Sequence, residues 1–168
     1  VRASGYDGRP LTLFAVAGDA GVQRAVALLQ ADWAAIGVKV VPQTMALGEF
    51  VRRAGRGEHD LAYANWFADD GDPDDFLAPV LSCAAAGHGT NKSQWCDPAF
   101  DALLAAARAT DAVDARRAAY AKAQALLQAS VPVIPLAHRV DAFAVSPRVA
   151  GVVVTPFGDC DFRHAALR

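Results

Sequence analysis

Runs typical of β-strands alternate with a helix-like spacing of apolar residues over residues 11–67, and this alternation restricts the fold more than any other feature. After the run LTLFAV, apolar residues recur three or four positions apart, as on one face of a helix, at Val22, Val26, Leu29, Trp33 and Ile36. Asp19 is placed to cap this helix and Gly37 to end it. The spacing therefore predicts a strand followed by a helix that packs against it.

The alternation continues to residue 67. VKVVPQT predicts a second strand, and Pro42, which lacks a backbone N–H, places that strand at a sheet edge. A short helix is predicted by Leu47, Phe50, Val51 and Ala54, and a third strand by DLAYANWF. The βαβαβ order predicts an α/β (α+β) fold in which helices flank a mixed sheet.

The second half of the chain is mostly helical by the same criteria. Asp97 and Pro98 predict the start of a helix that buries Phe100, Leu103, Leu104 and Ala107. A further helix from about residue 113 to residue 129, which Pro132 ends, is predicted to bury Ala119, Ala123, Leu126 and Leu127. Three short strands are then predicted by VIPLAHRV, DAFAV and GVVVTPFG.

Size, charge and the placement of histidines narrow the functional classes. A chain of 168 residues, 54% of them apolar, is large enough for one domain or one lobe with a core of its own. Its net charge of −2 does not favour a nucleic-acid partner, and no apolar run approaches the ~20 residues of a membrane span. The histidines are scattered and none lies at a metal-ligand spacing: His59, His88, His138 and His164. The sequence therefore predicts no enzyme, no metal site and no cofactor.

Two cysteines bracket a loop of small and polar residues. Cys83 and Cys96 are 13 positions apart, which fits neither a Cys-x-x-Cys redox pair nor a zinc knuckle. Spacing alone leaves two interpretations, a disulfide in an oxidising compartment or two reduced thiols in the cytosol. Cys160 has no evident partner.

The stretch NWFADDGDPDDF places five aspartates within seven positions directly after aromatic residues. The simplest interpretation is a solvated acidic turn, since Asp, Gly and Pro are turn formers. A calcium loop fits poorly, because the glycine and glutamate that the EF-hand motif requires are replaced by Asp75 and Leu81. Carboxylates paired for glycoside hydrolysis are a third interpretation. A fourth is a carboxylate that meets a ligand cation beside an aromatic wall, with Trp66, Phe67 and Asp69 acting together.

Several segments, in order, resemble a known family: QADWAAIGVKV, GEHDLAYANWFADDGDPDDFLAPVLSC, GTNKSQWCDPAFDALLAAARATD, RRAAYAKAQALL and VPVIPLAH. Together they are similar to the C-terminal lobe of family 5 extracellular solute-binding proteins, the dipeptide- and oligopeptide-binding components of bacterial ABC importers. The resemblance implies a two-lobe protein of the class II, or cluster C, type that encloses its ligand between the lobes. It also implies that residues 1–140 are a ligand-binding lobe, incomplete at its N-terminal end, and that 141–168 are strands returning toward an N-terminal lobe.

The resemblance assigns roles to individual residues. Trp66 and Asp69 match the family's Trp-x-x-Asp segment, whose aspartate pairs with the α-amino group of the peptide in peptide-binding members. Cys83 and Cys96 match a cysteine pair that is disulfide-linked in dipeptide-binding members. Two further groups are expected to have supporting roles: the turn residues Asp72, Pro73, Asp74 and Phe76, which cap and position the segment, and Asn91 and Trp95, which pack or line the rim. Asp75 is assigned to the solvated part of the turn.

The sequence departs from the family at one functional position. Dipeptide-binding members carry an arginine for the peptide carboxylate in the loop before the first helix, where this chain has AVAGDAGVQR. Arg24 is the only nearby arginine, and we expect it inside the helix. Dipeptide specificity is therefore not implied.

Together these observations predict a periplasmic, non-enzymatic component of an ABC transporter that binds a peptide or another amine-bearing solute and delivers it to the permease. Ligand-binding residues are expected at Asp69, Trp66 and Phe67, and a disulfide between Cys83 and Cys96. The alternative is the ligand-sensing domain of a transcriptional regulator that shares this lobe.

Overall fold

The main sheet has three parallel strands, and two helices pack against it. The computed structural model describes residues 4–87, 89–138, 140 and 142–168. β1 (Leu11–Val16) lies between β2 (Val40–Met45) and β3 (Leu61–Ala62), and it is parallel to both. The α/β class and the βαβαβ order are therefore as predicted, and β2, which contains Pro42, is at the edge. β3 is shorter than expected, because only Leu61 and Ala62 of the predicted strand DLAYANWF belong to the sheet.

Both faces of β1 are covered, which explains its unbroken apolar sequence. Leu13 and Ala15 point into a core with Val26 of α1 (Ala20–Ala35). Phe14, on the opposite face, packs with Phe50 of α2 (Leu47–Gly55). The period of two along the strand therefore distributes its side chains between the two helices.

α1 begins where the sequence predicted, but fewer of its apolar residues are buried than the spacing predicted. The Asp19 carboxylate accepts hydrogen bonds from the backbone N–H groups of Gly21 and Val22. Trp33 is only half-buried, and Ile36, expected on the core face, is 58% exposed. Ile36 lies just beyond the last turn of the helix, so it leaves the stripe that the spacing predicted.

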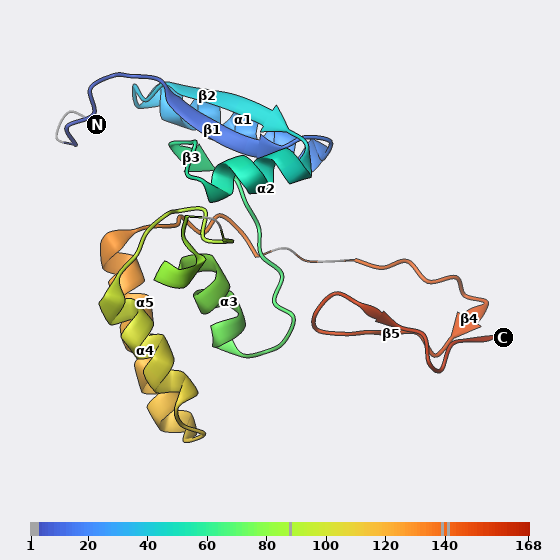
Figure 1. The fold of residues 1–168 in the computed structure, drawn as a ribbon. Coiled ribbons are helices and arrows are strands. Elements are labelled where there is room, and N and C mark those ends of the chain that lie inside the picture. Colours follow the sequence, from blue (N-terminus) through green and yellow to red (C-terminus); the bar gives the residue numbers. More distant parts are fainter. Residues whose placement is uncertain (1–3, 88, 139, 141) are drawn as a thin grey trace.

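Three helices form a second core. α3 (Pro73–Leu81), α4 (Pro98–Arg108) and α5 (Val113–Ser130) bury Leu77, Leu81, Phe100, Leu104, Ala107, Tyr120 and Ala123. The Asp97 cap of α4 is confirmed by its bond to the Ala99 N–H at 2.8 Å. The sequence did not predict α3, whose first turn is the acidic stretch itself. Figure 1 shows the sheet with its helices above this group, connected by the chain that leads into α3.

The loop between α3 and α4 carries the disulfide. Cys83, in the short helix η1 (Cys83–Ala85), is bonded to Cys96, so the pairing is confirmed. Asn91 is fully buried, and its amide donates to the backbone oxygens of Ser82 and Trp95. The indole of Trp95 packs edge-on against Phe100 with ring centroids 5.1 Å apart. The loop is thus held by a covalent bond and a buried amide, and only partly by apolar packing.

The chain after α5 differs from the prediction. The described residues of VIPLAHRV and DAFAV form no strand, and Arg139 and Asp141 of these segments lie outside the described residues. The reason is that this stretch pairs with no other strand of the described chain, so side chains such as Ile134 and Leu136 are 61% and 56% exposed. Two antiparallel ladders follow, β4 (Val149–Ala150) with β7 (Ala166–Leu167) and β5 (Val153–Val154) with β6 (Cys160–Asp161).

No helix in the described ranges combines the length and the apolar character that crossing a membrane requires.

Candidate functional site

The five aspartates of the acidic stretch have different environments. Asp72 is the N-cap of α3, and its carboxylate accepts from the Asp74 N–H at 2.9 Å. The same carboxylate forms an ion pair with Arg116 and accepts from the Tyr120 hydroxyl at 3.1 Å. These contacts, first the Asp74 N–H and then Tyr120 and Arg116, lower the pKa of Asp72. Asp72 is therefore held in its ionised form by the fold.

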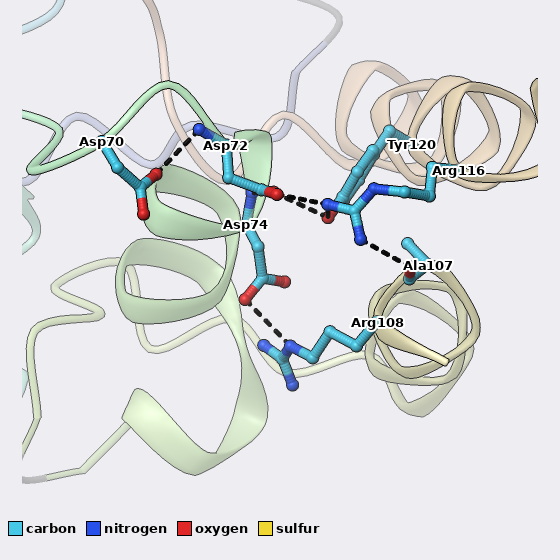
Figure 2. A network of polar contacts seen from close by, with 7 residues as sticks. All are labelled: Asp70, Asp72, Asp74, Ala107, Arg108, Arg116 and Tyr120. Atoms are coloured by element: carbon cyan, nitrogen blue, oxygen red, sulfur yellow. Dashed lines mark hydrogen bonds and ion pairs between the residues drawn. The ribbon is translucent and has the colours of Figure 1, made fainter. Parts of the chain in front are cut away.

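A second ion pair anchors the same helix start. The Asp74 carboxylate accepts from Arg108 Nε at 2.8 Å, and this hydrogen bond raises the pKa of Arg108. Arg116 also donates to the backbone oxygen of Ala107 at 2.8 Å, which ties α5 to α4. Figure 2 shows the two arginines reaching from α4 and α5 toward the first turn of α3. The expectation that Asp72 and Asp74 are scaffolding agrees with these contacts.

Two more aspartates bind backbone N–H groups. The Asp70 carboxylate accepts from the Asp72 N–H at 2.7 Å. The Asp75 carboxylate accepts from the Asp69 N–H at 2.5 Å. Asp75 was expected in the solvated part of the turn, and this assignment is wrong: the residue is half-buried in the first turn of α3 and directly contacts the predicted ligand-binding segment.

Asp69 is the exception. Among the residues that the structure describes, its carboxylate has no hydrogen-bonding or ion-pair partner, and the residue is exposed. Asp69 and the 51% exposed Phe67 line a pocket of ≈ 440 Å³. Of the five aspartates, this is the one whose charge the described chain leaves for a partner from outside.

The rest of the pocket comes from the distant C-terminal part of the chain. Besides Phe67, Ala68 and Asp69, it is lined by Phe143, Phe157, Gly158 and Asp159. The last three lie on the turn between β5 and β6, beside the chain that enters α3 (Figure 1). Sequence reasoning missed these residues, because PFG was interpreted as the end of the strand GVVVTPFG and nothing local connects it or the following Asp159 to Asp69. Among the described residues, the pocket lining thus combines three phenylalanines with two aspartates.

Trp66 holds the segment that carries Phe67 and Asp69, and it does not line the pocket itself. Its indole Nε1 donates to the backbone oxygen of Asp75 at 2.9 Å, and the ring is half-buried. Trp66 does not belong to the described lining, so the structure brings Phe67 and Asp69 to the pocket and leaves Trp66 to hold the segment.

Among the residues that the structure describes, neither a basic side chain in the pocket lining nor a metal site accompanies Asp69. Arg24 lies within α1, as expected, and is not part of the described pocket lining. In the described part of the chain, no three His, Cys, Asp or Glu side chains are grouped closely enough to hold a metal ion. The arrangement is suited to a ligand that carries a positive charge next to an apolar group.

Solved structures of similar fold include a dipeptide-binding protein. The chain is similar to the dipeptide binding protein of Pseudoalteromonas sp. SM9913, solved in complex with Met-Leu, with a TM-score of 0.86 and 32% sequence identity. The likeness covers 98% of this chain and 34% of that one. The chain therefore has the fold of one part of such a protein.

Two curated relatives are binding proteins as well. The probable di/tripeptide-binding protein 5 of Pseudomonas aeruginosa is 42% identical over 142 residues, which are 84% of this chain and 27% of the relative. The probable ABC transporter periplasmic-binding protein SapA of Escherichia coli is 41% identical over 136 residues, 80% of this chain and 25% of the relative. The chain thus spans about a quarter of the length of these relatives.

The family model described as bacterial extracellular solute-binding proteins, family 5 Middle, matches residues 1–88, just over half of the 168. The chain belongs to the family 5 bacterial extracellular solute-binding proteins.

Proposed function

We propose that this chain is the ligand-binding C-terminal lobe of a periplasmic, non-enzymatic protein that encloses a peptide or another amine-bearing solute and delivers it to an ABC permease. The observation that carries the proposal is the Asp69 carboxylate, which has no partner in the described chain and lines a pocket with aromatic walls. The names of the relatives support the peptide ligand, the periplasm and the transporter partner.

The charge of the pocket supports a cationic group on the ligand. Two carboxylates, Asp69 and Asp159, are part of its lining, and the other lining residues that the structure describes are uncharged. A ligand ammonium would pair with Asp69 while its apolar part packs against Phe67, Phe143 and Phe157. Because Arg24 lies in α1 and outside this lining, this lobe recognises the amine of the solute and not a ligand carboxylate.

The transcriptional-regulator alternative receives no support from the relatives named above, a probable di/tripeptide-binding protein and a probable ABC transporter periplasmic-binding protein. No feature of the pocket favours it over transport.

Removing the ligand's positive charge tests the proposal. Titration calorimetry compares Met-Leu with N-acetyl-Met-Leu in the full-length protein that carries this chain. Acetylation should cost about 2–5 kcal/mol of binding free energy, because it leaves a desolvated carboxylate without a partner. Asp69→Asn should weaken Met-Leu binding comparably.

Asp70→Asn is the matched control. Asp70 is the neighbouring residue, and its carboxylate contacts only the Asp72 N–H among the hydrogen bonds of the described chain, which an asparagine oxygen can still accept. Asp70→Asn should therefore leave the affinity for Met-Leu nearly unchanged. Equal affinities for the two ligands, or equal effects of the two substitutions, would contradict a role for Asp69 in binding an ammonium group.

A further inference from the structure

Asp75 contacts both ends of the segment that carries the candidate site. Its side-chain carboxylate accepts from the Asp69 N–H at 2.5 Å, and its backbone oxygen accepts from Trp66 Nε1 at 2.9 Å. Residues 66–69 lie outside any helix or strand, whereas Asp75 lies in the first turn of α3. One residue on a regular element therefore fixes a four-residue segment that has no regular structure of its own.

The carboxylate of Asp75 does not have the usual role of a residue at its helix position. Asp75 is the third residue of α3 after the N-cap Asp72, where an acidic side chain commonly reaches back to the N–H of the N-cap. Here the Asp72 N–H is already bound by the Asp70 carboxylate at 2.7 Å. The Asp75 carboxylate is thereby left for Asp69.

The backbone oxygen of Asp75 is also released from its usual partner. In a helix it would accept from the N–H of the residue four positions later, which here is Pro79, and proline has no N–H. The indole of Trp66 takes this place. A proline inside α3 thus provides the acceptor that holds Trp66.

The helix start that carries Asp75 is itself held in place. The ion pairs of Asp72 with Arg116 and of Asp74 with Arg108 join the first turn of α3 to α5 and α4, as Figure 2 shows. Contacts therefore run without interruption from the helical core through Asp75 to Asp69. Binding groups need support of this kind, because a charged contact tolerates displacement of only about 0.5 Å.

We propose that Asp75 is a positioning residue for ligand recognition: it sets the direction of the Asp69 carboxylate toward the pocket by holding the Asp69 backbone and Trp66. The inference rests on the proposed function, since it assumes that Asp69 receives a ligand ammonium. Asp75 itself contacts the ligand-binding segment and is not part of the pocket lining.

The test compares three variants of the full-length protein. Asp75→Ala removes the acceptor for the Asp69 N–H, and Asp75→Asn keeps an oxygen at the same place. The matched control is Asp70→Asn, which removes the charge next to Asp69 but keeps an oxygen that can accept from the Asp72 N–H, so that the Asp75 carboxylate stays with Asp69. The measured quantity is the ratio of the dissociation constants of N-acetyl-Met-Leu and Met-Leu, by calorimetry.

In the wild type this ratio should be about 30 or more, and Asp75→Ala should lower it about tenfold, because a misdirected carboxylate loses its preference for the ammonium. Asp75→Asn should restore the ratio to within about threefold of the wild type, and Asp70→Asn should keep it. If Asp75→Ala does not fold, Asp75→Ser replaces it with the same expectation, since its hydroxyl is too short to reach the Asp69 N–H.

The outcomes separate the inference from the function on which it rests. A wild-type ratio near one overturns the proposed function and this inference together. A high wild-type ratio that Asp75→Ala leaves unchanged, even with weaker binding of both ligands, overturns the inference alone and makes Asp75 a purely structural residue.

Discussion

At the scale of single residues, four of the five carboxylates in the acidic stretch have a hydrogen-bond donor within the described chain. Asp72 and Asp74 pair with Arg116 and Arg108, and Asp70 and Asp75 accept from backbone N–H groups. Each of these four contacts replaces water with a donor of positive or partly positive charge, so repulsion among neighbours is offset. Asp69 has no such contact in the described chain, and this difference makes it the candidate ligand-binding residue.

Asp72→Ala should reduce stability in a pH-dependent way. At pH 7 we expect the free energy of unfolding to fall by about 1–2 kcal/mol, the usual cost of losing an N-cap. The pKa of Asp72 is lowered in the folded state, so its contribution is complete above the unfolded-state pKa and is lost as pH falls through the lower folded-state value. Urea denaturation of wild type and variant between pH 7 and pH 2 should show the difference shrinking below about pH 4. A difference that stays constant over this range would assign the effect to packing.

At the scale of elements, α3 shows how one segment serves two purposes. The helix begins at Pro73 with Asp72 as its cap, which is a recognisable start signal, and it buries Leu77 and Leu81 in the helical core. Its first turn also carries the contacts that hold residues 66–69. Packing of α3 on α4 and α5 therefore determines where the candidate site lies.

A pair of leucine substitutions tests the helical core. Leu104 of α4 is 1% exposed, so Leu104→Ala should lower the free energy of unfolding by about 2–5 kcal/mol through lost burial and a cavity. Leu28 on α1 is 65% exposed, and Leu28→Ala should change it by less than about 0.5 kcal/mol. Thermal or urea unfolding followed by circular dichroism gives both values. Equal costs would mean that α4 does not pack on α5 as described.

At the scale of the whole molecule, two cores are joined through the disulfide loop. Gln94 donates to the backbone oxygens of Gly55, at the end of α2, and of Asn91, and it accepts from the Gly87 N–H. Lys92 Nζ also reaches the backbone oxygen of Val51 in α2, at 3.4 Å. The sheet unit and the helical unit are thus connected by polar contacts to backbone atoms, in addition to the chain itself.

Gln94→Ala should weaken this connection. We expect the free energy of unfolding to fall by about 1–3 kcal/mol, because partly buried backbone groups lose their partners. The m value in urea should also fall, because the two cores then unfold less cooperatively. Gln23→Ala, at an exposed position of α1, is the matched control and should leave both quantities near their wild-type values. A wild-type m value in Gln94→Ala would show that other contacts couple the two cores.

The sequence alone determined what depends on local geometry. The βαβαβ order, the edge position of β2 and the caps Asp19 and Asp97 follow from periodicity and from the chemistry of neighbouring residues, and the structure confirms them. The disulfide came from the family resemblance, since spacing left two interpretations.

Tertiary structure decided the rest. Which aspartate remains without a partner depends on Arg108 and Arg116, which lie 34 and 44 positions away from their partners. The pocket joins Asp69 to residues near 157, and the described residues of VIPLAHRV stay outside the sheet because a strand requires a partner. A spacing rule describes how residues share one face of one element, whereas these features depend on which elements meet, and packing of the whole chain determines that.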